Sequence, residues 1–279
     1  MIEKLTQEAI ELLKNLISKQ SFSGEENETA LLIMQWFSHH NIQFESDKHN
    51  VWAKNKFFNP SKKTILLNSH HDTVKPNKGY TRNPLSPDVE DGKLYGLGSN
   101  DAGGPLVALL ATFLQLADRT DLPFNLLFFS SAEEEISGGD GVAAVLPELG
   151  DIYCGIVGEP TSLDVAIAEK GLVVIDGTAK GKAGHAAREA GVNALYIALD
   201  DVNKIREFSF PEVSPLLGPV KLSVTQLEAG WQHNVVPDAC RFVIDARVNE
   251  CYTNEQIVTQ LQSSCQSELK ARSLRLQSS

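Results

Sequence analysis

Three short, continuously apolar runs in the first 160 residues constrain the fold of this chain most strongly. They are TILLNS (64–69), NLLFFSS (125–131) and IYCGIVG (152–158), and polar residues follow each one at once. Apolar runs of this length are typical of strands in a parallel sheet that helices cover on both faces. Helical patterns at 1–20 and 103–118 flank them. The sequence therefore predicts an α/β domain with a mainly parallel sheet.

The second part of the chain has a different character, because its predicted strands alternate apolar and polar residues. Its elements follow the order strand, helix, strand, strand, helix, strand, at 171–181, 193–208, 220–230, 239–249, 254–269 and 271–277. This order is that of a ferredoxin-like α+β domain with one exposed sheet face. We therefore expect two domains, 1–170 and 171–279.

Charge and cysteine content narrow the class of protein. The 279 residues carry a formal net charge of −11, and the pI is near 5.1, which argues against nucleic acid or an anionic membrane surface as a partner. No apolar stretch reaches the length of a membrane span, and the amphipathic start is unlike a signal peptide. The four cysteines are scattered without a CxxC spacing, so we expect reduced thiols in a cytoplasmic protein.

Acidic residues and histidine gather where the predicted strands end. His70 and Asp72 follow the first run, 133–135 is a run of three glutamates after the second, and Glu159 follows the third. Asp101 stands at the mouth of the helix at 103–118. Ligands of open α/β sheets bind beyond the carboxyl ends of the strands. Carboxylates and imidazole converging from separate elements are the ligands of divalent metals, so a metal site is predicted there.

Each cluster also has an ordinary structural explanation. His70 and Asp72 can form a local hydrogen-bonded pair, and Asp101 can cap the following helix. Three glutamates in a row are usually a solvated turn, and Glu159 can cap the turn at Pro160. Asp101 occupies the position of the last glycine of a G-x-G-x-x-G loop, which argues against a dinucleotide site. The four clusters in this order favour a metal-assisted hydrolase over the separate explanations.

Neighbouring residues at a strand end have different roles in this interpretation, because adjacent side chains point to different sides. One glutamate of the 133–135 run can bind a metal while its neighbour faces the attacking water as general base. Asp72 can orient the His70 ring. His71 points the other way and is not expected to be a ligand.

Seven motifs together resemble one family of enzymes. They occur in the family's order: SHHDTV, GKLYGLGSNDAGG, AEEEISGG, GEPT, AEKG, GKAGHAA and NVVPD. They resemble the acetylornithine deacetylase and succinyl-diaminopimelate desuccinylase family of co-catalytic zinc hydrolases, to which carboxypeptidase G and aminoacylase belong. GKLYGLGS and IVGEPTSL are most similar to the acetylornithine deacetylase branch.

The resemblance implies two divalent metal ions, zinc or alternatively cobalt, and a role for each matching residue. Four side chains are the implied ligands: His70 and Glu159 for one ion, Glu135 for the other, and Asp101 bridging both. Glu134 is the implied general base, and Asp72 is the partner that orients His70. Two positions depart from the family pattern, since Glu133 replaces the usual aspartate and Ala102–Gly103 replaces a common Met–Lys pair. Neither departure is at a ligand.

The second domain resembles the family's lid, through which relatives form homodimers. The resemblance implies that His185 reaches the partner subunit's active site and donates to the developing oxyanion. It also implies that Asn234 and Arg247 bind polar groups of the substrate. Taken alone, His185 and Asn234 could be turn residues and Arg247 a surface charge.

The implied substrate is a small N-acyl amino acid, and N-acetylornithine, an intermediate of arginine biosynthesis, is the leading candidate. N-acetylcitrulline, N-succinylornithine, a dipeptide substrate and a non-catalytic fragment remain alternatives. In the family the chain returns from the lid and supplies a last histidine ligand. No histidine follows His233 here, so we expect a truncated chain whose second metal site is incomplete.

Overall fold

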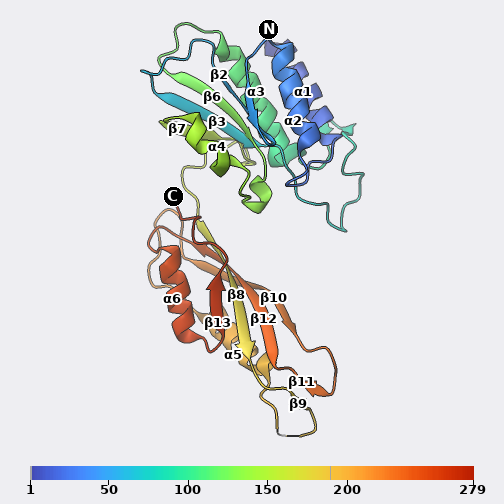
Figure 1. Ribbon diagram of the computed structural model, residues 1–279, viewed down its shortest axis with the longest axis vertical. Coiled ribbons are helices and arrows are strands. Elements are labelled where there is room, and N and C mark those ends of the chain that lie inside the picture. The colour runs from blue at the N-terminus through green and yellow to red at the C-terminus, as the bar shows by residue number, and fades with distance from the viewer. Residues whose placement is uncertain (1, 189) are drawn as a thin grey trace. The chain divides into compact units, whose positions relative to one another are not determined.

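The computed structural model describes residues 2–188 and 190–279, and the chain divides into two compact units at residues 164 and 165. Figure 1 shows a layered α/β unit and a second unit in which helices pack on an antiparallel sheet. Each unit has a separate hydrophobic core. The predicted fold class is confirmed.

The first unit is built on a five-stranded mixed sheet with the order β1-β2-β6-β3-β7. Its strands are β1 (Glu45–Asp47), β2 (Asn50–Lys54), β3 (Thr64–His70), β6 (Asn125–Ser131) and β7 (Cys154–Val157). Strand β3 runs parallel to β6 on one side and to β7 on the other. The register pairs His70 with Ser131, so β3 and β6 end at the same level. Residues that follow these strands therefore emerge on one edge of the sheet.

Helices cover both faces of this sheet (Figure 1). They are α1 (Ile2–Ile17), α2 (Asn27–His39), α3 (Gly104–Ala117) and α4 (Val142–Leu149). Successive side chains of a strand point to opposite faces, and β6 follows this rule. Phe128 packs with α1, α2 and α3, whereas Phe129 packs with α4. Burial on both faces explains why the run at 125–131 has no polar alternation. No helix among the described residues is long and apolar enough to cross a membrane.

Two small features of this unit lie outside the predicted elements. The antiparallel pair β1–β2 adds to the sheet beside β6, with Glu45 paired with Trp52. The long polar loop before α3 contains a two-stranded ribbon, formed by β4 (Val89–Glu90) and β5 (Lys93–Leu94). Neither pair is long enough to produce a periodic pattern in the sequence.

The second unit has the predicted β-α-β-β-α-β order. Its main elements are β8 (Gly171–Lys180), α5 (Ala194–Glu207), β10 (Lys221–Ala229), β12 (Ala239–Val248), α6 (Asn254–Ser264) and β13 (Glu268–Ala271). The antiparallel sheet has the order β10-β12-β8-β13. Buried and partly exposed residues alternate along β8, because α5 and α6 cover only one face. A two-stranded ribbon of β9 (Gly184–His185) and β11 (Val235–Val236) is added to this plan.

The last strand differs from the prediction. We expected a helix over 254–269 and a strand over 271–277, but the helix ends at Ser264 and the strand is Glu268–Ala271. The Asn254 side chain donates to the carbonyl oxygens of Leu274 and Leu276, at 3.1 and 2.9 Å. The Asn254 side chain thus holds this irregular segment in place. Its alternating leucines resemble the pattern of a strand.

Candidate metal centre

The carboxyl ends of three parallel strands bring the candidate ligands together. His70 is the last residue of β3, the glutamate turn follows β6, and Glu159 comes two residues after β7. The hydroxyl of Ser69, also at the end of β3, donates to the Gly158 carbonyl at 2.8 Å and so fixes the chain beside Glu159. These contacts lie within the first unit. The edge of the sheet that the sequence predicted as the site is thus the edge where these side chains meet.

His70, Asp101 and Glu159 form the closest group. One possible ligand atom from each lies within 4.8 Å of the other two. His70 Nε2 is 3.1 Å from Asp101 Oδ1 and 3.8 Å from Glu159 Oε2. The Glu134 carboxylate is 3.9 Å from the same nitrogen. Three ligand atoms converging on one point, with a carboxylate beside them, are the arrangement that a metal-assisted hydrolase requires.

A tight turn delivers Asp101 to this group. The turn spans Ser99–Gly103 and leads directly into α3. It begins after Gly98, whose φ of 75° is a left-handed conformation that favours glycine. A Cβ atom at Gly98 would also lie 2.6 Å from the Thr73 methyl group. Glycine is therefore required there by backbone conformation and by space.

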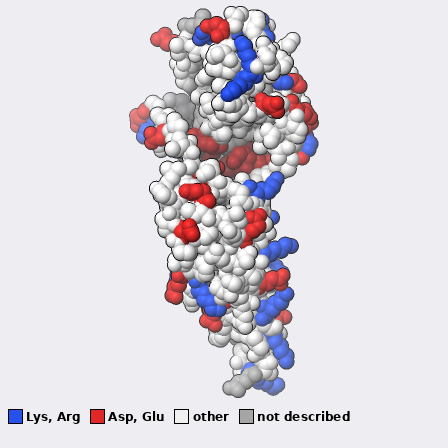
Figure 2. Space-filling view, turned by 90° about the vertical axis from the view of Figure 1, so that its left-hand side faces the viewer, with Lys and Arg blue, Asp and Glu red and all other residues white. Residues whose placement is uncertain are grey.

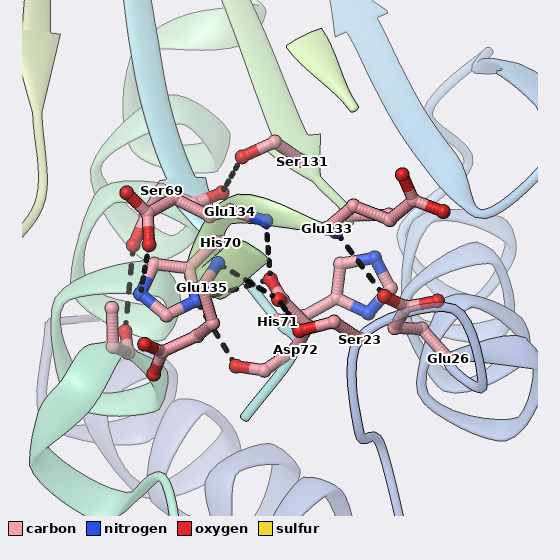
Figure 3. A network of polar contacts seen from close by, with 12 residues as sticks. Ser23, Glu26, Ser69, His70, His71, Asp72, Ser131, Glu133, Glu134 and Glu135 are labelled. Atoms are coloured by element: carbon pink, nitrogen blue, oxygen red, sulfur yellow. Dashed lines mark hydrogen bonds and ion pairs between the residues drawn. The ribbon is translucent and has the colours of Figure 1, made fainter. Parts of the chain in front are cut away.

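Asp72 organises the site from behind. It is fully buried, and its carboxylate lies 3.3 Å from His70 Nδ1. Its two oxygens accept from the backbone amides of Glu134 and Glu135, both at 3.1 Å, and the Ser23 hydroxyl donates at 2.7 Å. Figure 3 shows these contacts converging on Asp72. The same side chain thus orients the imidazole and the turn that carries the two glutamates.

Carboxylates surround His70. Burial lowers the pKa of His70, but the hydrogen bond and charge of Asp72 and the nearby glutamates raise it to about 9. Burial and the carboxylates of Glu134, Asp101 and Glu135 together raise the pKa of Glu159 to about 7, against the opposing effect of His70. Figure 2 shows acidic side chains gathered into one dense patch on this face. A bound cation would relieve the repulsion among carboxylates so close together.

A divalent metal fits these residues. The donors are one imidazole and several carboxylates, which suit a borderline cation such as zinc. The side chains of Asp101, Glu134 and Glu159 are 57%, 53% and 34% exposed, so the site is open to a small ligand. The convergence of donors and the raised pKa values of Glu135 and Glu159 both favour a bound cation.

Glu135 stands slightly apart from the three-residue group. Burial raises its pKa, and the Asp101 carboxylate raises it further. Its backbone amide is bound to Asp72. The structure therefore keeps Glu135 at the site, next to Glu134 on the single helical turn Glu134–Ile136.

His71 faces away from the metal cluster, as the alternation along the strand predicted. Its Nδ1 is 2.9 Å from the Thr29 hydroxyl, and its Nε2 is 2.9 Å from the His49 carbonyl oxygen. Burial lowers the pKa of His71 to about 4. The ring is a neutral, hydrogen-bonded part of the interior.

The glutamate turn begins with a strained residue. Glu133 has a φ of 54° and a ψ of 25°, a left-handed conformation that costs a residue other than glycine roughly 1–3 kcal/mol. Its carboxylate accepts from the amide of Asp140 at 3.1 Å. Gly138 packs so closely that a Cβ atom there would lie 2.6 Å from the Glu133 Cβ. The turn therefore has one compact conformation.

In the second unit, the β9–β11 ribbon brings His185 and Asn234 together. The Ala186 amide donates to the Asn234 carbonyl at 3.0 Å, and His185 pairs with Val235. His185 Nδ1 accepts from the Ala187 amide at 3.1 Å, so the neutral ring carries its proton on Nε2. Asn234 Oδ1 is buried without a hydrogen-bond partner among the described residues. Both side chains thus have hydrogen-bonding capacity that no hydrogen bond within the described part of the chain uses.

Arg247 is not brought to this ribbon. It lies near the end of β12, whereas the ribbon adjoins the opposite end, where Ala239 pairs with Lys180. Its guanidinium donates to both carboxylate oxygens of Asp245, at 2.8 and 3.2 Å. The structure therefore gives Arg247 an ion-pair partner within its own strand.

Sequence patterns do not reveal the residues that hold the glutamate turn. Ser23, Glu26 and His49 contribute to the network behind the metal cluster. They lie in a turn before α2 and in the β1–β2 connection, where no apolar periodicity marks them. The only signal was a cluster of polar residues in SFSGEE.

Comparison with known proteins gives a family match. The sequence profile of peptidase family M20/M25/M40 matches residues 66–276. This span contains every predicted ligand, Glu134 and the ribbon of the second unit.

Named relatives are moderately similar. Succinyl-diaminopimelate desuccinylase 2 of Ruegeria sp. (strain TM1040) is 26% identical over 269 residues, covering 89% of this chain and 67% of that protein. A probable carboxypeptidase of Aspergillus fumigatus is 27% identical over 268 residues, covering 84% of this chain. The chain spans only 60% of the length of the carboxypeptidase.

Solved structures share the fold. An M20 family metallo-carboxypeptidase from Sulfolobus solfataricus has a TM-score of 0.71 at 19% identity, covering 96% of this chain and 77% of that one. A Bacillus subtilis protein described as a dinuclear metal binding peptidase of the M20 family has a TM-score of 0.70 at 18% identity, covering 99% and 76%. The family match and the named relatives indicate a hydrolase that acts on amide bonds.

Proposed function

Because the chain belongs to peptidase family M20/M25/M40, we propose that it is a metal-dependent hydrolase that removes the acyl group from a small N-acyl amino acid. The observation that carries the proposal is the convergence of His70, Asp101 and Glu159, with the Glu134 carboxylate 3.9 Å from His70 Nε2. A convergent donor set beside an acidic side chain provides both a cation site and a group that can move a proton.

We assign the ligands by the roles of the matching motif residues. His70 and Glu159 would hold one divalent ion, Glu135 the other, and Asp101 both. Zinc is the first choice, with cobalt as a substitute. When bound, the ions polarise the scissile carbonyl and make a water molecule easier to deprotonate. Asp72 keeps the His70 ring in place by its contact with Nδ1.

Glu134 is the proposed general base. Its carboxylate takes a proton from the attacking water, and the oxygen of that water forms a bond to the amide carbon. The C–N bond then breaks as Glu134 returns the proton to the departing nitrogen. The products are a carboxylic acid and the free amino acid.

The second unit would supply the groups that recognise the substrate. The Nε2–H of His185 is a suitable donor to the oxyanion, because Ala187 already binds Nδ1. The Oδ1 of Asn234, which has no hydrogen-bond partner among the residues that the structure describes, would accept from a polar group of the substrate. Arg247 stays a weaker candidate, because Asp245 occupies its guanidinium. We propose that His185 acts in the site of a second subunit, within a homodimer formed by this unit.

The substrate class is best tested by assaying the candidate substrates side by side. N-acetylornithine is our first candidate, and N-succinyl-diaminopimelate and dipeptides are the alternatives suggested by the motif pattern and by the names of the relatives. The purified chain, loaded with zinc or cobalt, would be assayed against all three classes. Turnover of dipeptides alone would replace the deacylase proposal with a peptidase. No turnover of any class, in protein shown to bind metal, would favour a non-catalytic chain.

A Glu134→Gln variant tests the role of the base. We expect metal affinity close to that of the wild type and a rate lower by about 10²–10⁴, because only proton transfer is lost. Glu148→Gln, on the exposed side of α4, is the matched control and should keep full activity. Near wild-type turnover in Glu134→Gln would remove Glu134 from the mechanism.

Mixing two inactive variants tests the shared site. Subunits with His185→Ala and subunits with Glu134→Gln should regain part of the activity when mixed, since some heterodimer sites would hold both native groups. Absence of recovery after demonstrated subunit exchange would refute action in a second subunit.

The cytoplasmic location stays a prediction from the sequence.

A further inference from the structure

A second buried carboxylate, outside the metal-binding group, holds the start of the glutamate turn. Glu26 is fully buried just before α2. Its Oε1 accepts from the backbone amides of Gly24 and Glu133, at 2.7 and 3.1 Å. Its Oε2 lies 2.6 Å from His49 Nδ1. One side chain thus joins the turn before α2, the β1–β2 connection and the segment after β6.

Glu26 completes a pattern begun by Asp72. Three consecutive backbone amides, those of residues 133, 134 and 135, donate to two buried carboxylates. Glu26 binds the first amide, and Asp72 binds the other two (Figure 3). Successive amides in a turn form a concave site for an anion. Here both anions belong to the protein, so the orientation of the turn depends on them.

The amide of Glu133 is the most consequential of the three. Glu133 adopts a left-handed conformation, and the chain changes direction there between β6 and the turn. A rotation at this residue would move Glu134 and Glu135 together. Asn50 provides a separate restraint on the flanking residues, because it accepts from the Ala132 amide at 3.0 Å and donates to the Asp140 carbonyl at 2.6 Å. Loss of the Glu26 side chain would therefore make the turn more mobile, while Asn50 would still hold the residues on either side of it.

We propose that Glu26 is a positioning residue, whose carboxylate holds the Glu133 amide and thereby aims Glu134 at the substrate and Glu135 at a metal ion. The inference rests on the proposed function for the roles of these two glutamates. Among the described residues, the hydrogen-bond partners of the Glu26 side chain are the amides of Gly24 and Glu133 and the ring of His49, and none of the proposed ligands. Its effect depends on where its oxygen atoms lie and not on its charge alone, since two of its contacts are backbone amides.

Three substitutions in the full chain separate position from charge. Glu26→Ala removes the acceptor, and Glu26→Asp keeps the charge but withdraws the carboxylate by about 1.5 Å, one C–C bond. Glu26→Gln keeps an oxygen at the same reach, and its amide group can donate to His49 Nδ1. Glu25→Ala is the matched control, because Glu25 is the exposed neighbour and its carboxylate contacts only Gln20 among the hydrogen bonds of the described residues. The measurements are zinc affinity by chelator competition and hydrogen exchange of the amides of residues 133–135.

We expect Glu26→Ala and Glu26→Asp to weaken zinc binding about tenfold, the lower end of the effect of an outer partner of a ligand. The amides of 133–135 should exchange faster in both, while Glu26→Gln and Glu25→Ala should stay within about twofold of the wild type. If Glu26→Ala does not fold, the comparison of Glu26→Asp with Glu26→Gln decides. Wild-type affinity and exchange in Glu26→Asp would overturn the inference, as would equal losses in Glu26→Gln. A wild-type chain that binds zinc but hydrolyses no amide would refute the proposed function and leave this test valid.

Discussion

Asp201 is a buried carboxylate that joins two segments of the second unit, and its removal should destabilise that unit alone. It lies on α5 and is fully buried. Its carboxylate accepts from the Ser267 amide at 2.7 Å and from the Gln266 amide at 3.0 and 3.1 Å. Lys204 donates to it from the exposed side at 3.0 Å. The contacts fasten α5 to the segment between α6 and β13.

The size of the effect follows from these partners. Asp201→Ala leaves the buried Ser267 amide without an acceptor, which costs roughly 1–3 kcal/mol. It also removes a charged hydrogen bond to the Gln266 amide, worth roughly 1.5–3 kcal/mol. Together these losses predict a decrease of roughly 2.5–6 kcal/mol in the free energy of unfolding of this unit. Lys204 can be rehydrated and is not counted.

Hydrogen exchange of the full chain can measure this loss. The slowest amides of β8 and β12 should exchange about a hundredfold faster or more, since each 1.4 kcal/mol is about a factor of ten. Fluorescence of the buried Trp52 should report an unchanged first unit. Asp200→Ala, at the exposed neighbouring position, is the matched control. A loss below about 1 kcal/mol, or an equal loss in the control, would refute the structural account of Asp201.

The stability that the charged Asp201 carboxylate contributes should depend on pH. Burial raises the pKa of Asp201, but the hydrogen bonds from Ser267, Gln266 and Lys204 outweigh it and hold the pKa below its usual value. A lowered pKa stabilises the fold above the pKa of the unfolded chain, about 4. That stability is lost as the pH falls through the folded value. The difference between wild type and Asp201→Ala should therefore be largest near neutral pH and shrink below about pH 4.

Two further predictions concern the first unit. Gly138→Ala should weaken zinc binding and lower activity, because the added Cβ would meet Glu133, whereas Gly139→Ala has open space and should be neutral. Equal behaviour of the two variants in a chelator competition would contradict the close packing of the turn. Zinc at 100 times its dissociation constant should raise the free energy of unfolding of the first unit by about 2.7 kcal/mol. Urea titrations followed by tryptophan fluorescence would test this, and a shift that persists in His70→Ala would place the ion elsewhere.

Much of the metal centre was predictable because strand ends are legible in the sequence. His70 and Glu159 directly follow apolar runs, and parallel strands bring their ends to one edge. The run before His70 is largely buried, but the expected burial of the run before Glu159 is wrong, because β7 is an end strand of the sheet and its four residues are exposed. Glu26 had no such mark. Its partner amide at Glu133 is 107 positions away, and nothing local distinguishes a carboxylate that will be buried from one that will face water. The difference between Glu25 and Glu26 is made entirely by tertiary structure.

The strand at the end of the second unit shows the opposite case, in which a local pattern was misleading. Leu274 and Leu276 alternate with polar residues, as in a half-buried strand. The backbone carbonyls of both residues are instead bound by Asn254. The Asn254 side chain thus provides the hydrogen bonds that a neighbouring strand would have provided. The alternation of apolar and polar residues cannot distinguish these two cases.

The parallel pairing of β3 with β6 and β7 affects how the protein folds. His70 pairs with Ser131, and Asn68 pairs with Val157, so segments about 60 and 90 positions apart must meet before the ligands converge. Contacts of such long range are slow to form, because chain entropy is lost before they are made. The unfolded polypeptide has no preformed site, and cation affinity is therefore gained only when β3, β6 and β7 pair. During refolding, metal uptake should follow the formation of the helices in time and report completion of the central sheet.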